Sequence, residues 1–258
     1  MLKQAIARVL PEGLQRRIQF ARATLHRIPG HALYQEAVRA RSGIEIGGPS
    51  MVFRTSLPLY QVVGELDGVN FAGETLWEGA LRPGPTYDRG GATPGWQFIC
   101  DATALDGVPS ARYDVLLSSN CLEHVANPLK ALAEWKRVLK PGGSLVLVLP
   151  RKDGNFDHRR PETTLAHLLD DLHRDVGEDD LTHLDEILRL HDLSRDPLAG
   201  THAAFRERSL RNVANRTLHH HVFDQPLMRE MLAHAGFRVL HMHTSASDHF
   251  ALAVDERR

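Results

Sequence analysis

Histidine dominates the residues of this chain that could do chemistry, and its distribution is uneven. The sequence holds 16 histidines, and 13 of them follow Pro150. His158 stands beside Asp157 in a charged segment, and the run His219-His220-His221 comes shortly before Asp224. An unperturbed histidine titrates near neutral pH, so these side chains are candidates for a general base that removes a proton from a substrate.

Metal binding is the alternative chemistry for the same histidines. In an extended chain His219 and His221 lie on one face and His220 on the other, so two of them could bind a divalent metal with His158 or a nearby carboxylate. The chain has no CxxC or HExxH-type spacing, and the sequence therefore favours a base over a metal. We predict His158, His220 and His221 as the catalytic side chains.

The elements that would position such residues are clearest between Tyr113 and Pro150. An apolar run ends in Ser118-Ser119-Asn120, an amphipathic helical pattern follows, and Pro141-Gly142-Gly143 leads into a second apolar run. A strand, a crossover helix and a second strand require the two strands to be parallel. Both runs are apolar on both faces, so we expect them in the middle of a covered sheet, with ligands bound beyond the carboxyl ends of the strands.

The rest of the chain supplies further elements. We expect amphipathic helices before about residue 41, strands near residues 42–46, 69–71 and 96–100, and a Gly- and Pro-rich loop over 83–94. Three helical patterns follow Pro150. A helix over 227–235 and two strands over 238–243 and 249–254, close enough to pair as a hairpin, complete the pattern.

Bulk properties exclude several classes of protein. The 258 residues carry a formal net charge of -1, so no overall basic field would gather nucleic acid. No apolar run is long enough to span a membrane, and the N-terminal residues lack the apolar core of a secretory signal. Two cysteines do not suggest a disulfide framework. We expect a cytoplasmic protein, and the sequence indicates no oligomeric state.

The order of elements and the residues at strand ends resemble the class I S-adenosylmethionine-dependent methyltransferases, and within them the small-molecule type 11 branch. The resemblance covers roughly residues 43–150, with weaker support over 224–254, and its most specific part is YDVLLSSNCLEHVANP…RVLKPGGSLVLVLP. It implies an α/β, Rossmann-like, seven-stranded and mostly parallel sheet with helices on both faces and a C-terminal antiparallel hairpin. We expect an N-terminal helical lid over 1–42 and a methyltransferase domain over 43–258, in which 151–223 is a helical insertion that covers the substrate.

The resemblance also implies a site for S-adenosylmethionine. Glu45, Gly47 and Gly48 match the first motif, an acidic residue followed by a glycine turn, near the amino-acid end of the cofactor. Pro49, Ser50 and Met51 replace the further glycines of that motif, so the turn must have a different shape.

Three further positions follow from the same resemblance. Asn70 stands where the family usually has an acidic residue for the ribose hydroxyls, and an amide oxygen can still accept those hydrogen bonds. Asp101 matches the acceptor for the adenine amino group, with the N–H of Ala102 reaching a ring nitrogen. Ser119 matches the position beside the methionine part of the cofactor.

These features predict an enzyme that transfers a methyl group from S-adenosylmethionine to a hydroxyl of a small molecule or carbohydrate, with a histidine as base. Two alternatives remain open. One is a metal-assisted O-methyltransferase that uses the histidines after Pro150, and the other is a non-catalytic binding module of the same fold.

Overall fold

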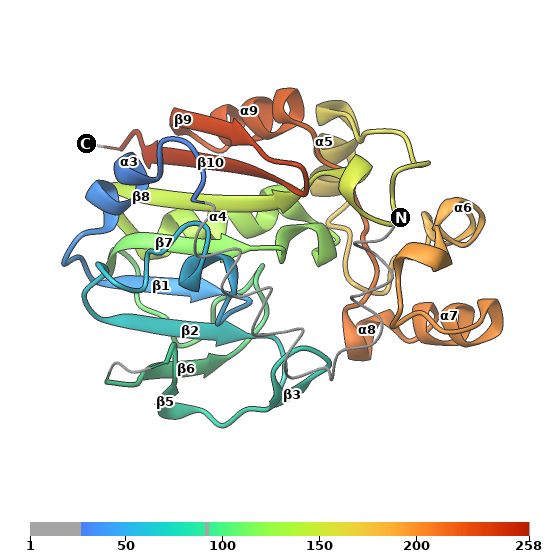
Figure 1. Cartoon of the computed structure of the whole chain (residues 1–258), viewed down its shortest axis with the longest axis horizontal. Helices are drawn as coiled ribbons and strands as arrows, with labels where there is room; N and C mark the ends of the chain where they lie inside the picture. Colours follow the sequence, from blue (N-terminus) through green and yellow to red (C-terminus); the bar gives the residue numbers. More distant parts are fainter. Residues whose placement is uncertain (1–26, 91–92, 258) are drawn as a thin grey trace, which may run out of the picture.

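An eight-stranded sheet forms the centre of the computed structural model, which describes residues 27–90 and 93–257 (Figure 1). Its strand order is β5-β6-β2-β1-β7-β8-β10-β9. The strands are β1 (Gly43–Ile46), β2 (Leu66–Asn70), β5 (Gly84–Tyr87), β6 (Gly95–Ile99), β7 (Tyr113–Ser119), β8 (Leu139–Pro150), β9 (Phe237–Thr244) and β10 (Asp248–Asp255). A separate short ribbon pairs β3 (Glu74–Thr75) with β4 (Gly79–Ala80).

The pairing confirms the predicted mostly parallel sheet with an antiparallel C-terminal hairpin. β6, β2, β1, β7 and β8 run parallel to one another. β10 pairs antiparallel with both β8 and β9. The chain leaves β1 in one direction across the sheet for β2 and β6 and in the other for β7 and β8, so a topological switch point lies between β1 and β7.

The helices cover both faces of this sheet or lie beyond its end. They are α3 (His31–Val38), α4 (Pro128–Val138), α5 (Leu165–His173), α6 (Leu184–Leu190), α7 (His202–Ser209), α8 (Asn212–Asn215) and α9 (Gln225–His234), with short 3₁₀ turns η1 (Val52–Arg54), η2 (Leu122–His124), η3 (Lys152–Gly154) and η4 (Leu193–Arg195). α4 is the crossover helix between β7 and β8. It begins with Pro128 and is capped by Asn127, whose side chain accepts from the N–H of Lys130.

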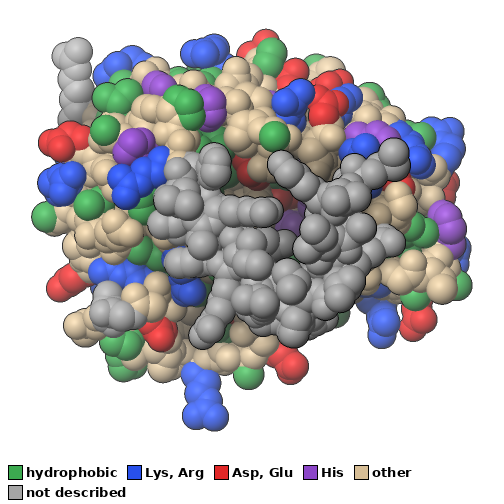
Figure 2. Space-filling view, in the orientation of Figure 1, with side chains coloured by type: hydrophobic (Ala, Val, Ile, Leu, Met, Phe, Trp, Pro, Cys, Tyr) green, Lys and Arg blue, Asp and Glu red, His purple; other side chains and the backbone are tan. Residues whose placement is uncertain are grey.

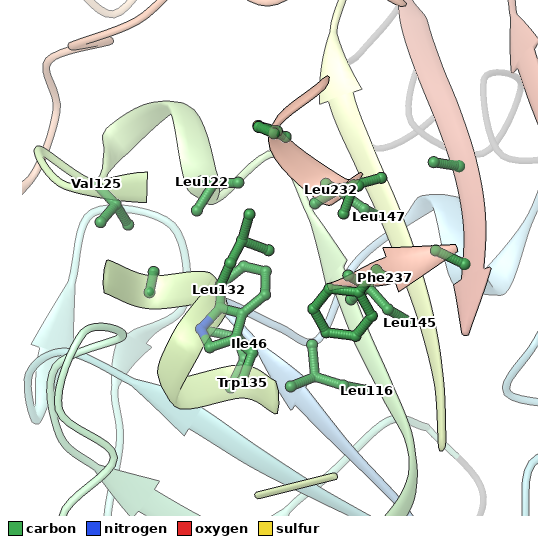
Figure 3. Close-up of a cluster of buried hydrophobic side chains, with 14 of the residues drawn as sticks. Ile46, Leu116, Leu122, Val125, Leu132, Trp135, Leu145, Leu147, Leu232 and Phe237 are labelled. Carbon is green, nitrogen blue, oxygen red and sulfur yellow. The ribbon is translucent and has the colours of Figure 1, made fainter. Parts of the chain in front are cut away.

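Side-chain alternation along β7 and β8 builds two cores, one on each face of the sheet. Leu116 and Leu145 belong to the core that also contains Trp135 of α4 and Phe237, which Figure 3 shows packed together. Val115, Leu117, Val146 and Val148 face the opposite core, which contains Tyr34, Val38 and Phe53. Both faces of these strands are therefore covered, as the continuous apolar runs predict.

The sheet has one strand more than the seven that the resemblance implied. β5 lies within the segment predicted as a loop and pairs antiparallel with β6 at the edge of the sheet, where a proline in a strand is tolerated. Tyr87 fixes this strand, because its ring packs so closely on Gly68 that a Cβ at Gly68 would lie 2.0 Å from a ring carbon. Glycine and proline are typical of loops, so the composition of this segment did not predict a strand.

The segment between β8 and α9 contains α5 to α8, and Figure 1 shows these helices beyond the carboxyl ends of the parallel strands. Ile187, Ala199, Phe205 and Leu218 form a small core of their own there. Of the predicted N-terminal lid, residues 1–26 lie outside the described residues, and α3 is its described part.

The surface carries mixed charge. In Figure 2, Lys and Arg side chains are interspersed with Asp and Glu around the described part of the face in view, in keeping with the net charge of -1. Within residues 27–90 and 93–257 we find no helix of the length and apolarity that a membrane span requires.

Candidate active site

A cavity of about 450 Å³ opens where the carboxyl ends of the parallel strands meet, and its volume is within the range of small-molecule sites. Its walls come from segments that follow β1, β2, β6 and β7, including Gly47, Asn70, Asp101 and Ser119. The fold thus brings these four predicted cofactor residues together around one cavity at the switch point of the sheet. Ala102 lines it as well.

The turn after β1 is packed too tightly for larger residues. Gly47 has a φ of 77°, in the left-handed region, and a Cβ there would lie 2.6 Å from Cys121 Sγ. A Cβ on Gly48 would lie 2.3 Å from Cδ of Glu45 and 2.4 Å from the hydroxyl of Tyr87. The turn can therefore pack this closely against Cys121, Glu45 and Tyr87 only with glycine at both positions.

Glu45 is fully buried, and the described residues that line the cavity do not include it. Its Oε2 accepts hydrogen bonds from the hydroxyls of Tyr60 (2.5 Å) and Tyr87 (2.6 Å). Its Oε1 accepts from the N–H (3.0 Å) and the hydroxyl (2.6 Å) of Ser50. Burial raises the pKa of Glu45, and these donors act against that rise. The carboxylate holds the Pro49–Ser50 segment in place from behind the cavity wall.

Asn70 lines the cavity, and both polar atoms of its side chain form hydrogen bonds with neighbouring residues. Its Nδ2 donates to the carbonyl of Gly48 (3.1 Å), and its Oδ1 accepts from Gln97 (2.9 Å). Glu78, at the turn between β3 and β4, places a carboxylate in the same wall, and burial raises its pKa. No sequence pattern joins this turn to β2, so sequence reasoning missed Glu78 as a candidate.

Asp101 is bound by an arginine from the insertion. Its Oδ1 accepts from the N–H (2.8 Å) and the hydroxyl (2.7 Å) of Thr103, and its Oδ2 accepts from Arg216 (2.9 Å). Burial would raise the pKa of Asp101, but these partners keep it below its ordinary value. The Arg216 guanidinium also pairs with Glu178 and lies over the ring of Phe71, 5.4 Å from its centroid. Sequence reasoning missed Arg216, which lies 115 residues from Asp101.

Ser119 and Cys121 form the wall that continues from β7. Ser119 is 7% exposed and lines the cavity beside Asn120, whose φ of 49° turns the chain sharply. Burial raises the pKa of the Cys121 thiol far above its ordinary value. Cys121 is therefore an apolar wall residue and unsuited to be a nucleophile.

An aspartate–histidine pair stands in the wall of the same cavity. His219 lines the cavity, and its Nδ1 lies 2.5 Å from Oδ2 of Asp157. Burial would lower the pKa of His219, but the ion pair with Asp157 raises it. In turn His219 and Arg160 outweigh burial at Asp157 and lower its pKa to about 2.

A buried arginine, Arg160, holds the Asp157–His219 pair in position. It is 2% exposed and donates to Asp157 (3.1 Å), to the carbonyl of His219 (2.8 Å) and to the carbonyl of His220 (3.2 Å). Glu186 of α6 accepts from the same guanidinium (2.9 Å). One buried arginine thus sets the position of both members of the pair.

Two further ionisable groups adjoin His219. The ring centroid of His124 lies 4.6 Å from that of His219, and burial keeps the pKa of His124 well below its ordinary value, so this histidine is neutral. Glu123 is 1% exposed, and burial raises its pKa to about 7. One ligating atom from each of Glu123, His124 and His219 lies within 4.8 Å of the others.

The three histidines predicted as catalytic lie elsewhere. Nε2 of His158 is 2.9 Å from a carboxylate oxygen of Asp192. His220 contacts Asn212 (3.0 Å), and Nε2 of His221 is 3.1 Å from the carbonyl of Ala126. Among the described residues, the histidines in the cavity wall are His124 and His219. The segment 217–222 is irregular, so the strict alternation of an extended strand does not decide which ring faces the cavity.

Comparisons with known proteins agree with this geometry. Residues 88–147 match a family model described as a methyltransferase domain. No curated protein matches the chain. In a solved complex of the Haloferax volcanii Trm112 methyltransferase activator with a putative methyltransferase, the matching chain has 11% identity and a TM-score of 0.52, with 94% of each chain covered.

Two further solved structures are similar. A putative methyltransferase from Bacillus halodurans C-125 has 13% identity and a TM-score of 0.50, covering 89% of this chain and 99% of its own. A 1,6-didemethyltoxoflavin-N1-methyltransferase from Burkholderia thailandensis, solved with 1,6-didemethyltoxoflavin and S-adenosylhomocysteine, has 15% identity and a TM-score of 0.49, covering 88% and 76%. At such identities the likeness shows the fold.

Proposed function

We propose that this chain, a class I S-adenosylmethionine-dependent methyltransferase, methylates a hydroxyl group of a small polyhydroxylated molecule or carbohydrate, with His219 as general base. The observation that carries the proposal is the Asp157–His219 pair in the wall of the cavity formed by the strand ends. His219 replaces His158, His220 and His221 as our candidate for the base, because its ring lines the cavity and theirs do not.

The residues of the cavity fit S-adenosylmethionine. The backbone at Gly47 gives a close approach for the amino-acid end, while Asn70 and Glu78 offer acceptors for the ribose hydroxyls. Asp101 offers an acceptor for the adenine amino group, and Ala102 offers a backbone N–H for the ring. When bound, the cofactor supplies a methyl group on a sulfonium sulfur that leaves as a neutral thioether. The protein chiefly supplies alignment.

The base would act on the acceptor hydroxyl. A neutral His219 would accept the O–H proton on Nε2 during methyl transfer and would become an imidazolium. Asp157, which the buried Arg160 guanidinium helps to keep ionised, would stabilise that imidazolium and fixes the ring through Nδ1. His124, kept neutral by burial, adds no competing positive charge.

The composition of the outer wall supports a polyhydroxylated acceptor. Trp77 is 47% exposed and lies 5.0 Å, centroid to centroid, from His124. Asn120 and Asn155 add amide groups to the lining. An aromatic ring beside several hydrogen-bonding groups suits a molecule with apolar C–H faces and a hydroxylated rim, as in a sugar.

A metal-assisted reaction is the second candidate, and the clustering of Glu123, His124 and His219 on the cavity wall favours it. A metal there would lower the pKa of the acceptor hydroxyl directly. Supplying different divalent metals separates the two candidates. If a metal acts as the Lewis acid, the rate depends on which metal is supplied. If a histidine is the base, the rate does not depend on the metal.

The cofactor and the base can be tested separately. Calorimetry with S-adenosylhomocysteine tests the cofactor site, and mass spectrometry for a methyl mass increase identifies the acceptor. With that acceptor, we expect His219→Ala to lower kcat by about 10²–10⁴-fold with unchanged affinity for S-adenosylhomocysteine. His202→Ala, an exposed histidine of the insertion, is the matched control. An undiminished kcat in His219→Ala would contradict the assignment, and absence of methyl transfer to any hydroxylated acceptor would favour the binding-module alternative.

A further inference from the structure

A second group of histidines lies outside the cavity wall, in the insertion. His167 and Asp171 stand one turn apart on α5, His183 directly precedes α6, and His221 belongs to the segment that leads to α9. One ring nitrogen from each of the three histidines lies within 4.8 Å of the others. Three segments that are distant in the sequence therefore bring side chains of the types that bind zinc close together.

The distances in this group approach those of a tetrahedral site. Nε2 of His167 lies 3.0 Å from Nε2 of His183 and 3.2 Å from Oδ2 of Asp171. The same Asp171 oxygen lies 3.6 Å from Nε2 of His221, the nitrogen of that ring which contacts a backbone carbonyl, so the other nitrogen, Nδ1, would be the ligand. Zinc holds nitrogen and oxygen ligands at about 2.0–2.2 Å, which places neighbouring ligands of a tetrahedron about 3.3–3.6 Å apart.

Two buried polar atoms in the group have no hydrogen-bond partner among the described residues. They are Oδ2 of Asp171, which is 2% exposed as a residue, and Nδ1 of His221, also 2% exposed. Buried polar atoms are nearly always satisfied, so a buried carboxylate oxygen among imidazole rings suits a bound cation. Nε2 of His221 is 3.1 Å from the Ala126 carbonyl, the kind of contact that orients a histidine whose other nitrogen binds a metal.

We propose that His167, Asp171, His183 and His221 bind one zinc ion. Four protein ligands close the coordination sphere, which is typical of a structural rather than a catalytic zinc site. The ion would tie α5 and the start of α6 to the segment 219–221 and so help to hold His219 in the cavity wall. The site is distinct from the cluster around Glu123 and does not depend on the methyl acceptor.

Zinc binding to the full-length chain, without an added histidine tag, tests the proposal. After removal of metal with a chelator and reconstitution with zinc chloride, we expect about one tightly bound zinc per chain by elemental analysis. Asp171→Asn and His183→Ala should weaken zinc binding by roughly tenfold or more. His173→Ala removes an exposed histidine from the same helix and should bind zinc as the wild type does.

Two outcomes would overturn the zinc site. One is wild-type protein that retains no stoichiometric zinc after reconstitution. The other is equal zinc affinity in the wild type, Asp171→Asn and His183→Ala, because the histidine pair would then be only a hydrogen-bonded contact. If a variant does not fold, Co²⁺ in the wild type decides. The intense visible absorption of tetrahedral Co²⁺ supports the site, and the weak spectrum of an octahedral ion contradicts it.

Discussion

Tyr87→Phe tests whether Glu45 organises the cofactor turn from behind the cavity. The variant removes one hydroxyl, which donates to Oε2 of Glu45 at 2.6 Å in a fully buried site. A hydrogen bond to a charged group contributes about 1.5–3 kcal/mol, and Glu45 Oε2 keeps its other donor, Tyr60. We therefore expect the free energy of unfolding to fall by about 1.5–3 kcal/mol, and Tm to fall by roughly 3–12 °C for a chain of this size.

Tyr34→Phe is the matched control for this experiment. Tyr34 is also fully buried, but its hydroxyl meets an imidazole nitrogen, Nδ1 of His241, at 3.2 Å rather than a carboxylate. Removing that contact should cost about 0.5–1.5 kcal/mol, less than the loss at Tyr87. Urea unfolding measures both variants, and calorimetry with S-adenosylhomocysteine should show weaker binding for Tyr87→Phe alone. Equal unfolding free energies for Tyr87→Phe and the wild type would refute the role given to Glu45.

Two other changes probe the cavity from different sides. Asp101→Asn should weaken binding of S-adenosylhomocysteine by roughly tenfold, since one acceptor for the adenine amino group is lost, while Asp106→Asn at an exposed position should leave the affinity unchanged in calorimetry. Gly47→Ala should lower the free energy of unfolding by about 2–5 kcal/mol, through the left-handed φ and overpacking. Its Cβ would lie 2.6 Å from Cys121 Sγ. It would also lie 2.7 Å from Cβ of Cys121, so the second substitution must remove both atoms. In urea unfolding, adding Gly47→Ala to Cys121→Gly should cost only the part due to the left-handed φ, and no cost at all would argue against backbone strain.

The central sheet could be predicted because local pattern and global fold agree there. The apolar runs of β7 and β8, the crossover helix α4 and the glycine turn after it all specify one arrangement. Asn70, Asp101 and Ser119 were predicted from the resemblance, and they reach one cavity because the carboxyl ends of parallel strands meet at the same edge of the sheet. β5 could not be found in this way, since its stability comes from Tyr87 packing on Gly68 rather than from strand propensity.

The base was harder to predict than the cofactor residues. Three consecutive histidines have the same chemistry, and only long-range contacts distinguish them. The N–H of His220 donates to the carbonyl of Glu123 (2.8 Å), and Arg160 binds the carbonyls of His219 and His220. Those contacts position the backbone beside His219, which lines the cavity, and none of them has a signal in the local sequence. Asp157 contacts His219, whereas the histidine next to Asp157 in the sequence, His158, pairs with Asp192.

The segment between β8 and α9 contacts the cavity wall at two points. Its Arg160 joins the Asp157–His219 pair to Glu186 of α6, and its Arg216 reaches Asp101, the predicted acceptor for the adenine amino group. The proposed zinc ligand His221 lies two residues after His219, so the metal and the arginine would constrain the same short segment from two sides. The proposed catalytic pair gains its geometry from contacts of this insertion, outside the predicted sheet pattern. This explains why the resemblance predicts the methyl donor, while the acceptor chemistry must be derived from the histidine-rich segment itself.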